Sequence, residues 1–104
     1  MTVRGSRVNE HTQCAHYHSH RDVVAVKFKC CDTFYACIHC HEELAGHSPV
    51  VWGRDERDKQ VILCGKCQNT LSIVEYLGCG NSCPRCEAAF NPRCAEHHHL
   101  YFEL

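Results

Sequence analysis

The feature that most restricts how this chain can fold is a repeated pair of cysteines with two residues between them. Cys64 and Cys67 form one pair, and Cys83 and Cys86 form another after a gap of 15 residues. Two residues between thiolates allow a tight turn that directs both sulfurs at one metal ion, and two such turns complete a tetrahedral zinc site. A redox-active pair is the alternative for Cys64 and Cys67, but it would need a βαβ setting and no second pair. We therefore expect one zinc ion at these four cysteines.

The rest of the chain is also rich in metal ligands, with 11 Cys and 10 His among 104 residues. A chain of this length buries only a marginal apolar core, so metal ions or cross-links have to stabilise it. A disulfide framework is the alternative to zinc, but the cysteine count is odd and the first ten residues lack the apolar segment of a signal peptide. No stretch approaches the roughly 18–20 apolar residues of a membrane span. We expect a soluble, cytoplasmic, zinc-binding protein with no membrane insertion.

The formal net charge is −1 with histidine neutral. This value gives no electrostatic argument for binding nucleic acid, and no basic stripe accompanies the aromatic residues. We therefore expect no nucleic-acid partner.

The first half of the chain contains eight further candidate ligands, the number that two tetrahedral zinc ions require. They are Cys14, His16, Cys30, Cys31, Cys37, Cys40, His41 and His47. Neighbouring residues of an extended segment point to opposite faces. Each of the two adjacent ligand pairs, at 30–31 and at 40–41, is therefore expected to divide between two ions, so that the two sites interleave. The sequence leaves open which member binds which ion.

The pattern between the ligands predicts a small, irregular α+β fold. Strands are expected at 22–29, 33–36 and 60–63, where β-branched and aromatic residues gather. Short helices are expected at 38–45, which stops at a glycine, and from Ser72, where the spacing fits a capping box. The charged residues 53–60 read as a loop. The expected architecture is short β-hairpins and zinc knuckles with one or two short helices and a second half like a zinc ribbon.

Together these residues resemble the CHY-type zinc finger family. The matching motifs are Cys14-Ala-His16-Tyr17, Lys29-Cys30-Cys31, Tyr35-Ala-Cys37, Cys40-His41-Glu42, His47 and the two later cysteine pairs. The resemblance covers residues 14–102 and implies three zinc ions held by twelve ligands. We expect one domain at 14–104, with an interleaved two-zinc half at 14–50 and a zinc-ribbon-like half at 60–104, after a flexible tail at 1–13.

The ending, from Phe90 to Phe102, resembles the stand-alone branch of this family. That branch includes small microbial proteins and a fungal protein of the mitochondrial intermembrane space that assists assembly of small Tim chaperones. The resemblance therefore gives the intermembrane space as an alternative location. Family members that are ubiquitin ligases carry a second zinc module and a RING domain after the CHY module. We expect neither here, so the resemblance does not imply ligase activity.

Four further cysteines and histidines are weaker candidates for zinc binding or thiol chemistry. Cys94, His97 and His99 could form a fourth zinc site, and the alternative is a C-terminal helix with polar histidines. A hydrolytic zinc there is disfavoured because no general base accompanies it. Cys79 fits no pair and reads as a free thiol.

The function expected from the sequence is that of a non-enzymatic zinc module. It is expected to be a monomer that mediates interaction with a protein partner, which the sequence does not identify. The alternative is a thiol- or zinc-handling factor that keeps a partner's cysteines free of metal so that they can oxidise.

Overall fold

The computed structural model describes residues 3–5, 7–9, 11–17, 19–91 and 100–103. A mixed five-stranded sheet in the order β1-β3-β2-β4-β5 forms its centre. The strands are β1 (Val3–Arg4), β2 (Val24–Phe28), β3 (Thr33–Tyr35), β4 (Gln60–Cys64) and β5 (Thr70–Ser72). The helices are α1 (Ile38–Leu44), the 3-10 turn η1 (Arg54–Glu56) and α2 (Ile73–Leu77). The predicted small α+β fold is confirmed.

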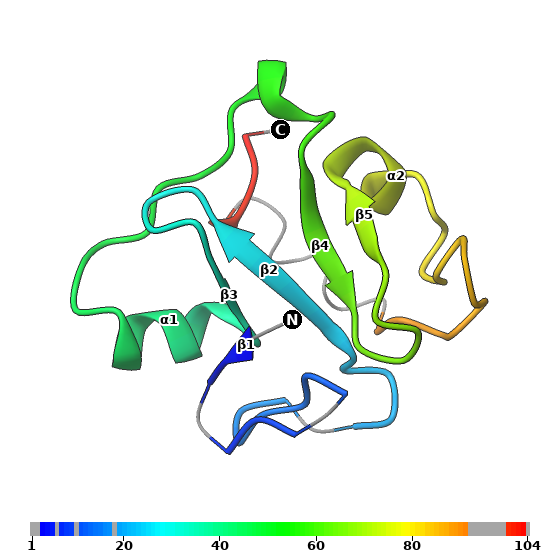
Figure 1. Cartoon of the computed structure of the whole chain (residues 1–104), viewed down its shortest axis with the longest axis horizontal. Coiled ribbons are helices and arrows are strands. Elements are labelled where there is room, and N and C mark those ends of the chain that lie inside the picture. Colours follow the sequence, from blue (N-terminus) through cyan, green and yellow to red (C-terminus); the bar gives the residue numbers. More distant parts are fainter. Residues whose placement is uncertain (1–2, 6, 10, 18, 92–99, 104) are drawn as a thin grey trace.

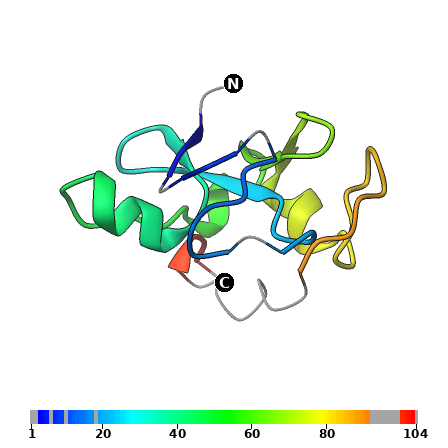
Figure 2. The same ribbon diagram turned by 90° about the horizontal axis from the view of Figure 1, so that it is seen from below.

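The sheet has a helix at each end. Figures 1 and 2 show α1 beside the β1–β3 end and α2 beside the β5 end, with β2 and β4 between them. Strand β2 is antiparallel to both of its neighbours, β3 and β4. The sheet therefore joins strands from both expected halves of the chain into one framework.

The central strand β2 is buried on both of its faces. Val26 and Phe28 point to one side of the sheet and Ala25 to the other, and all three are at most 6% exposed. Their burial explains why this segment reads as an almost continuous apolar run.

The N-terminal segment differs from the expected flexible tail at residues 3–4. Val3 and Arg4 form β1, which pairs in parallel with Phe34 and Tyr35 of β3. The backbone N–H of Ala36 donates to the Arg4 carbonyl at 3.0 Å. The open edge of β3 offers unpaired backbone groups, and these can order a short polar segment that has no apolar pattern of its own.

The turn between β4 and β5 lies against the N-terminal segment. A Cβ atom on Gly65 would come within 2.2 Å of the His11 carbonyl oxygen, so only glycine allows this approach. The following helix α2 begins at Ser72 with both hydrogen bonds of a capping box to Glu75, which confirms the predicted start.

The C-terminal residues 100–103 pack back onto the fold. The backbone N–H of Trp52 donates to the Tyr101 carbonyl at 2.9 Å, and the backbone N–H of Glu103 donates to the Trp52 carbonyl at 2.7 Å. Phe102 is 1% exposed and lies in the core. This segment therefore completes the hydrophobic core.

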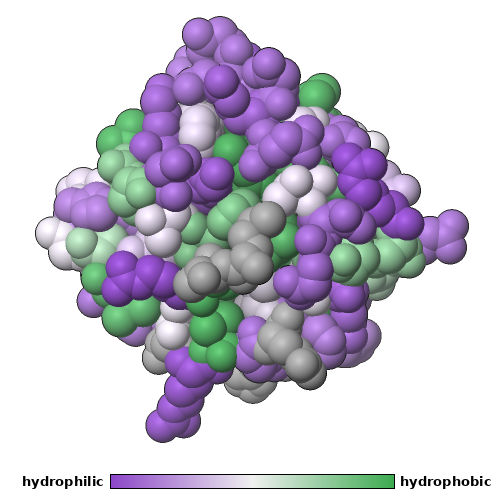
Figure 3. Space-filling view, viewed as in Figure 1, coloured by the Kyte–Doolittle hydropathy of each residue, from purple (hydrophilic) through white to green (hydrophobic). Residues whose placement is uncertain are grey.

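The surface carries few large apolar side chains. Leu44, Val50, Val51 and Val74 are the exposed large hydrophobic residues of the described part. On the face shown in Figure 3, green hydrophobic areas are small and are separated by purple hydrophilic side chains. Within the described residues, every helix is too short or too polar to cross a bilayer.

Candidate metal centres

The twelve cysteines and histidines expected to bind zinc lie in three groups of four. The first cluster is Cys14, His16, Cys37 and Cys40; the second cluster is Cys30, Cys31, His41 and His47; the third cluster is Cys64, Cys67, Cys83 and Cys86. In each group the four candidate ligand atoms lie within 4.8 Å of one another. The first and second clusters interleave along the chain, as the sequence predicts.

The separations between ligand atoms fit zinc. A Zn–S bond of about 2.3 Å places two sulfurs of a tetrahedral site about 3.8 Å apart. The Sγ–Sγ distances are 3.8 Å for both the Cys64–Cys86 and the Cys67–Cys83 pairs. A disulfide would require about 2.05 Å. Thiolate sulfur and imidazole nitrogen are also the usual donors of structural zinc sites, so each group could hold one zinc ion.

The first cluster joins the segment before β2 to the start of α1. Cys37 is the N-cap of α1, and its sulfur accepts a hydrogen bond from the Cys40 backbone N–H at 3.4 Å. His16 Nδ1 lies 3.5 Å from the sulfurs of both Cys37 and Cys40 and 3.8 Å from that of Cys14. His16 Nδ1 is therefore the nitrogen that faces the site.

A carboxylate holds the other nitrogen of His16. Glu43 Oε1 lies 2.7 Å from His16 Nε2, and this hydrogen bond raises the pKa of His16. The same arrangement, in which a carboxylate fixes the outer nitrogen of a metal-binding histidine, is frequent in zinc sites. Sequence reasoning did not identify Glu43. Its position three residues after Cys40 on the same helix is the signal that could have indicated it.

Two thiols of the first cluster share a hydrogen bond. The contact with Cys37 lowers the pKa of the Cys14 thiol to about 4, and the contact with Cys14, together with burial, raises the pKa of Cys37. The shared hydrogen bond thus favours the thiolate, the form of cysteine that binds metal, at one of the two sulfurs.

The second cluster corrects one sequence expectation and confirms another. Cys40 and His41 divide between the first and second clusters, as predicted. Cys30 and Cys31 were expected to divide as well, but both lie in the second cluster, with their sulfurs 3.9 Å apart. The expectation assumed an extended segment, whereas these residues lie in the turn between β2 and β3, where side chains need not alternate.

His41 is the buried histidine of the second cluster. It stacks on Phe28 with ring centroids 4.2 Å apart and meets the edge of Tyr35 at 5.0 Å. Its Nε2 lies 3.2 Å from the Cys30 sulfur. Burial lowers the pKa of His41, and the neighbouring His47 adds to this effect. The ring is therefore kept in the neutral form, which can bind metal.

His47 closes the second cluster from the surface. Its Nδ1 donates to the Ala45 carbonyl at 2.9 Å, and its Nε2 lies 3.2 Å from the Cys30 sulfur. The backbone carbonyl thus fixes the ring nitrogen that is left for a metal. The whole residue is exposed to solvent.

The third cluster consists of two turns with the same backbone geometry. The N–H of Gln68 donates to the Cys64 carbonyl, and that of Glu87 to the Cys83 carbonyl, each at 2.8 Å. Both donors have positive φ angles, 62° for Gln68 and 64° for Glu87. Burial raises the pKa of Cys64 to about 12. This repeated turn beside the β4–β5 hairpin is the expected zinc-ribbon-like arrangement.

The remaining candidates lie outside these clusters. Cys79 is half-buried, and its thiol donates to the Tyr76 carbonyl at 3.0 Å. Cys94, His97 and His99, proposed from the sequence as a fourth site, lie outside the described residues.

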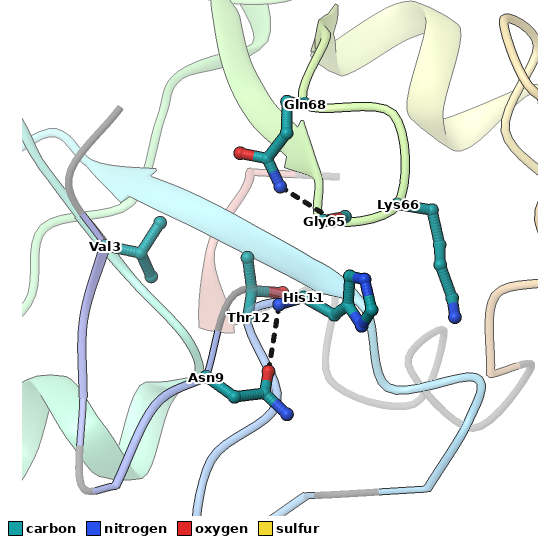
Figure 4. Close-up of a pocket in the computed structure, with 7 residues that line it drawn as sticks. All are labelled: Val3, Asn9, His11, Thr12, Gly65, Lys66 and Gln68. Carbon is teal, nitrogen blue, oxygen red and sulfur yellow. Dashed lines mark hydrogen bonds between the residues drawn. The ribbon is translucent and has the colours of Figure 1, made fainter.

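A pocket of about 470 Å³ lies where the N-terminal segment meets the β4–β5 turn (Figure 4). The N-terminal segment contributes Asn9, His11 and Thr12 to its wall, opposite Gly65 and Lys66. Asn9 Oδ1 accepts a hydrogen bond from the His11 N–H at 2.9 Å. None of the twelve clustered residues lines this pocket, so it is separate from the candidate metal sites.

Comparison with known proteins gives one family. The family described as CHY zinc finger matches residues 14–91. The chain is 39% identical to Helper of Tim protein 13 of Saccharomyces cerevisiae, over 97% of this chain and 90% of the relative. It is 35% identical to Helper of Tim protein 13 of Kluyveromyces lactis, over 96% and 87%. It is 41% identical to an uncharacterised protein of Schizosaccharomyces pombe, over 97% and 88%.

Proposed function

Because the chain belongs to the CHY zinc finger family, we propose that it is a non-enzymatic scaffold of three zinc ions that assists the assembly of other proteins. The observation that carries the proposal is the set of three clusters, each with four protein ligand atoms. Four protein ligands close a tetrahedral shell and leave no position for a substrate, which is typical of structural rather than catalytic zinc.

The proposed ligands are the twelve residues of the three clusters. Their sulfur and nitrogen atoms have the separations and the chemistry of structural zinc sites. In the interleaved pair, His16 would bind through Nδ1, whereas His41 and His47 would bind through Nε2. When bound, zinc would cross-link the segment before β2, the β2–β3 turn and α1.

The proposed partners are Tim proteins. Two relatives that align over nearly all of this chain are named as helpers of Tim proteins. This role favours the mitochondrial intermembrane space, the alternative expected from the sequence, over the cytosol. We propose that the chain acts there as a monomer and without nucleic acid.

Native mass spectrometry of the full chain, with and without a strong chelator, tests the metal scaffold. We expect three zinc ions per chain, and loss of the native far-UV circular dichroism and Trp52 fluorescence once they are removed. Structural zinc supplies on the order of 10–16 kcal/mol of apparent binding free energy, more than a domain of this size retains as net stability. A native spectrum that survives complete removal of metal would contradict the proposal.

Binding to a reduced Tim protein tests the assembly role. We expect a complex with the zinc-loaded chain in size-exclusion chromatography, and none with the chelated chain, because the binding surface depends on the folded scaffold. A disulfide-bonded, zinc-independent protein of similar size serves as the control. A zinc-loaded chain that forms no complex would refute this part of the proposal and leave the scaffold itself standing.

Thiol and zinc handling is a second candidate function, favoured by the exposure of the second cluster. Its His47 is exposed and both of its cysteines are only half-buried. A chain with such a site could exchange zinc with the thiols of a partner. The test mixes the chain with a cysteine-rich partner protein that is loaded with zinc. It follows both the loss of zinc from the partner and the rate at which the partner's cysteines oxidise. If neither changes, this function is excluded.

A further inference from the structure

The three clusters differ in how deeply they are buried. The first contains Cys14, Cys37 and Cys40, which are at most 4% exposed, and the third contains Cys64 and Cys83, which are at most 1% exposed. In the second cluster no cysteine is fully buried. Cys86 of the third cluster is exposed too, but it shares that cluster with the buried Cys64 and Cys83. In the second cluster only His41 is buried, so a chelator or an incoming thiol can approach both of its cysteines.

The segment that carries His47 has little to hold it in place. Residues 46–51 follow the end of α1, and all six are exposed. Within the part of the chain that the structure describes, these six residues make no backbone hydrogen bond. Exposed segments with few backbone hydrogen bonds and few buried contacts open locally at low free-energy cost. His47 is therefore the clustered residue that can move away most easily.

The histidines of the second cluster also have weaker outer support than His16. His16 is held by the Glu43 carboxylate at 2.7 Å, and its ring packs at a tilt against that of His39 with a centroid distance of 5.5 Å. His47 is held by a single backbone carbonyl. The Nδ1 atom of His41 is buried and has no hydrogen-bond partner among the described residues. Since hydrogen bonds to the outer nitrogen raise the basicity of a histidine ligand, the first cluster should retain metal more firmly than the second.

From these three observations we propose that the second cluster is the exchange site of the molecule, and that His47 is the ligand that gives way. This inference rests on the proposed zinc scaffold and deepens the second candidate function. The incoming group is a cysteine thiol of a protein partner. It loses its proton to solvent and would bind as the thiolate in place of the His47 imidazole, which leaves as the neutral ring. The resulting set of three sulfurs and one nitrogen has the same composition as the first cluster, so the exchange leaves a stable donor set. The first and third clusters stay closed and keep the fold.

The order of metal release tests the proposal directly. The zinc-loaded chain is titrated with substoichiometric chelator, native mass spectrometry counts the remaining zinc, and short pulses of N-ethylmaleimide mark the exposed thiols for peptide mapping. Among the clustered cysteines, we expect Cys30 and Cys31 to be alkylated first, at the point where two zinc ions remain. Earlier alkylation of cysteines from either other cluster, or simultaneous release of all three ions, would overturn the proposal.

A gain-of-retention variant tests the role of His47 without unfolding the protein. His47→Cys supplies the same donor set as the exchanged state, and we expect it to slow alkylation of Cys30 and Cys31 about ten-fold or more, the scale of effect that ligand-tuning changes have on metal sites. The control is Val74→Cys, which adds a thiol at a position that is 57% exposed and belongs to none of the three clusters. Equal alkylation rates in His47→Cys and the unmodified chain would overturn the assignment of His47.

The proposed zinc scaffold and the proposed exchange site can be refuted separately. Fewer than three zinc ions in the untreated chain would refute the proposed scaffold. Three ions with a different order of release would leave the scaffold intact and refute only the exchange site.

Discussion

At the scale of single residues, the histidines of the first and second clusters differ in the hydrogen bonds that their outer ring nitrogens make. His16 and Glu43 form the clearest case, because a side chain from α1 fixes a ligand that lies 27 positions earlier in the chain. Motif spacing identifies His16 but contains no information on such a contact.

Replacing Glu43 should weaken metal retention at the first cluster. We expect Glu43→Ala to speed zinc release from this cluster about 10–100-fold, because the outer nitrogen of His16 loses its acceptor. Cobalt-substituted protein distinguishes the sites, since the ligand sets of the three clusters give different absorption spectra. The matched control is Glu42→Ala, whose carboxylate is similarly exposed and contacts His39 instead. Equal release rates in the two variants would show that Glu43 does not position His16.

Gly65 is the residue where backbone packing leaves no room for a side chain. We expect Gly65→Ala to destabilise the fold by about 1–3 kcal/mol, because the new methyl group would collide with the His11 carbonyl. Chemical denaturation of the zinc-loaded protein measures the change. Gly78→Ala is the control, since a Cβ there meets its nearest neighbour at an ordinary 3.4 Å. A neutral Gly65→Ala variant would mean that the N-terminal segment is not held against the turn.

At the scale of elements, short helices here depend on particular capping contacts. Helix α2 is only five residues long and starts with the reciprocal bonds of Ser72 and Glu75. Helix α1 starts at Cys37, and its first N–H, that of Ile38, donates to the Tyr101 hydroxyl at 3.1 Å. The C-terminal segment therefore supports the helix that carries ligands of both interleaved clusters.

The capping box predicts the effect of a small change at Ser72. We expect Ser72→Ala to cost about 1 kcal/mol of stability, the usual effect of removing an N-cap hydroxyl. Thermal unfolding of the zinc-loaded protein gives the value. Ser48→Ala, on the exposed segment after α1, should be within error of the unmodified chain. If both variants behave alike, the cap contributes nothing measurable.

The contact between Tyr101 and α1 predicts a local effect. Tyr101→Phe removes the acceptor of the Ile38 N–H, which should cost about 1 kcal/mol and loosen the start of α1. Hydrogen exchange should become faster at the first amides of α1 and stay unchanged in α2. Uniform protection across both helices would argue against this support.

At the scale of the whole molecule, one sheet connects the second and third clusters. Strand β2 leads into the Cys30–Cys31 turn, strand β4 ends at Cys64 of the third cluster, and the two strands pair directly. Loss of the third cluster should therefore affect β4 and, through it, β2.

This connection predicts a single unfolding transition. Cys83→Ser, which breaks the third cluster, should lower the midpoint seen by Trp52 fluorescence as much as the midpoint seen by far-UV circular dichroism. Trp52 lies near β2, where its indole N–H donates to the Lys27 carbonyl at 2.7 Å. Two separate transitions would show instead that the halves fold independently.

The sequence by itself predicted the twelve candidate ligands and their number, because zinc chemistry requires particular residue types at short spacings. It also predicted the helix at α1, the capping box of α2 and the strands around them, since these depend on local pattern. The tertiary structure decided how the ligands are shared. Cys30 and Cys31 lie together because the turn between the two predicted strands places them, and the alternation of side chains along an extended segment does not hold in that turn. The edge strand β1 and the support of His16 by Glu43 depend on contacts between distant segments, which no local pattern encodes.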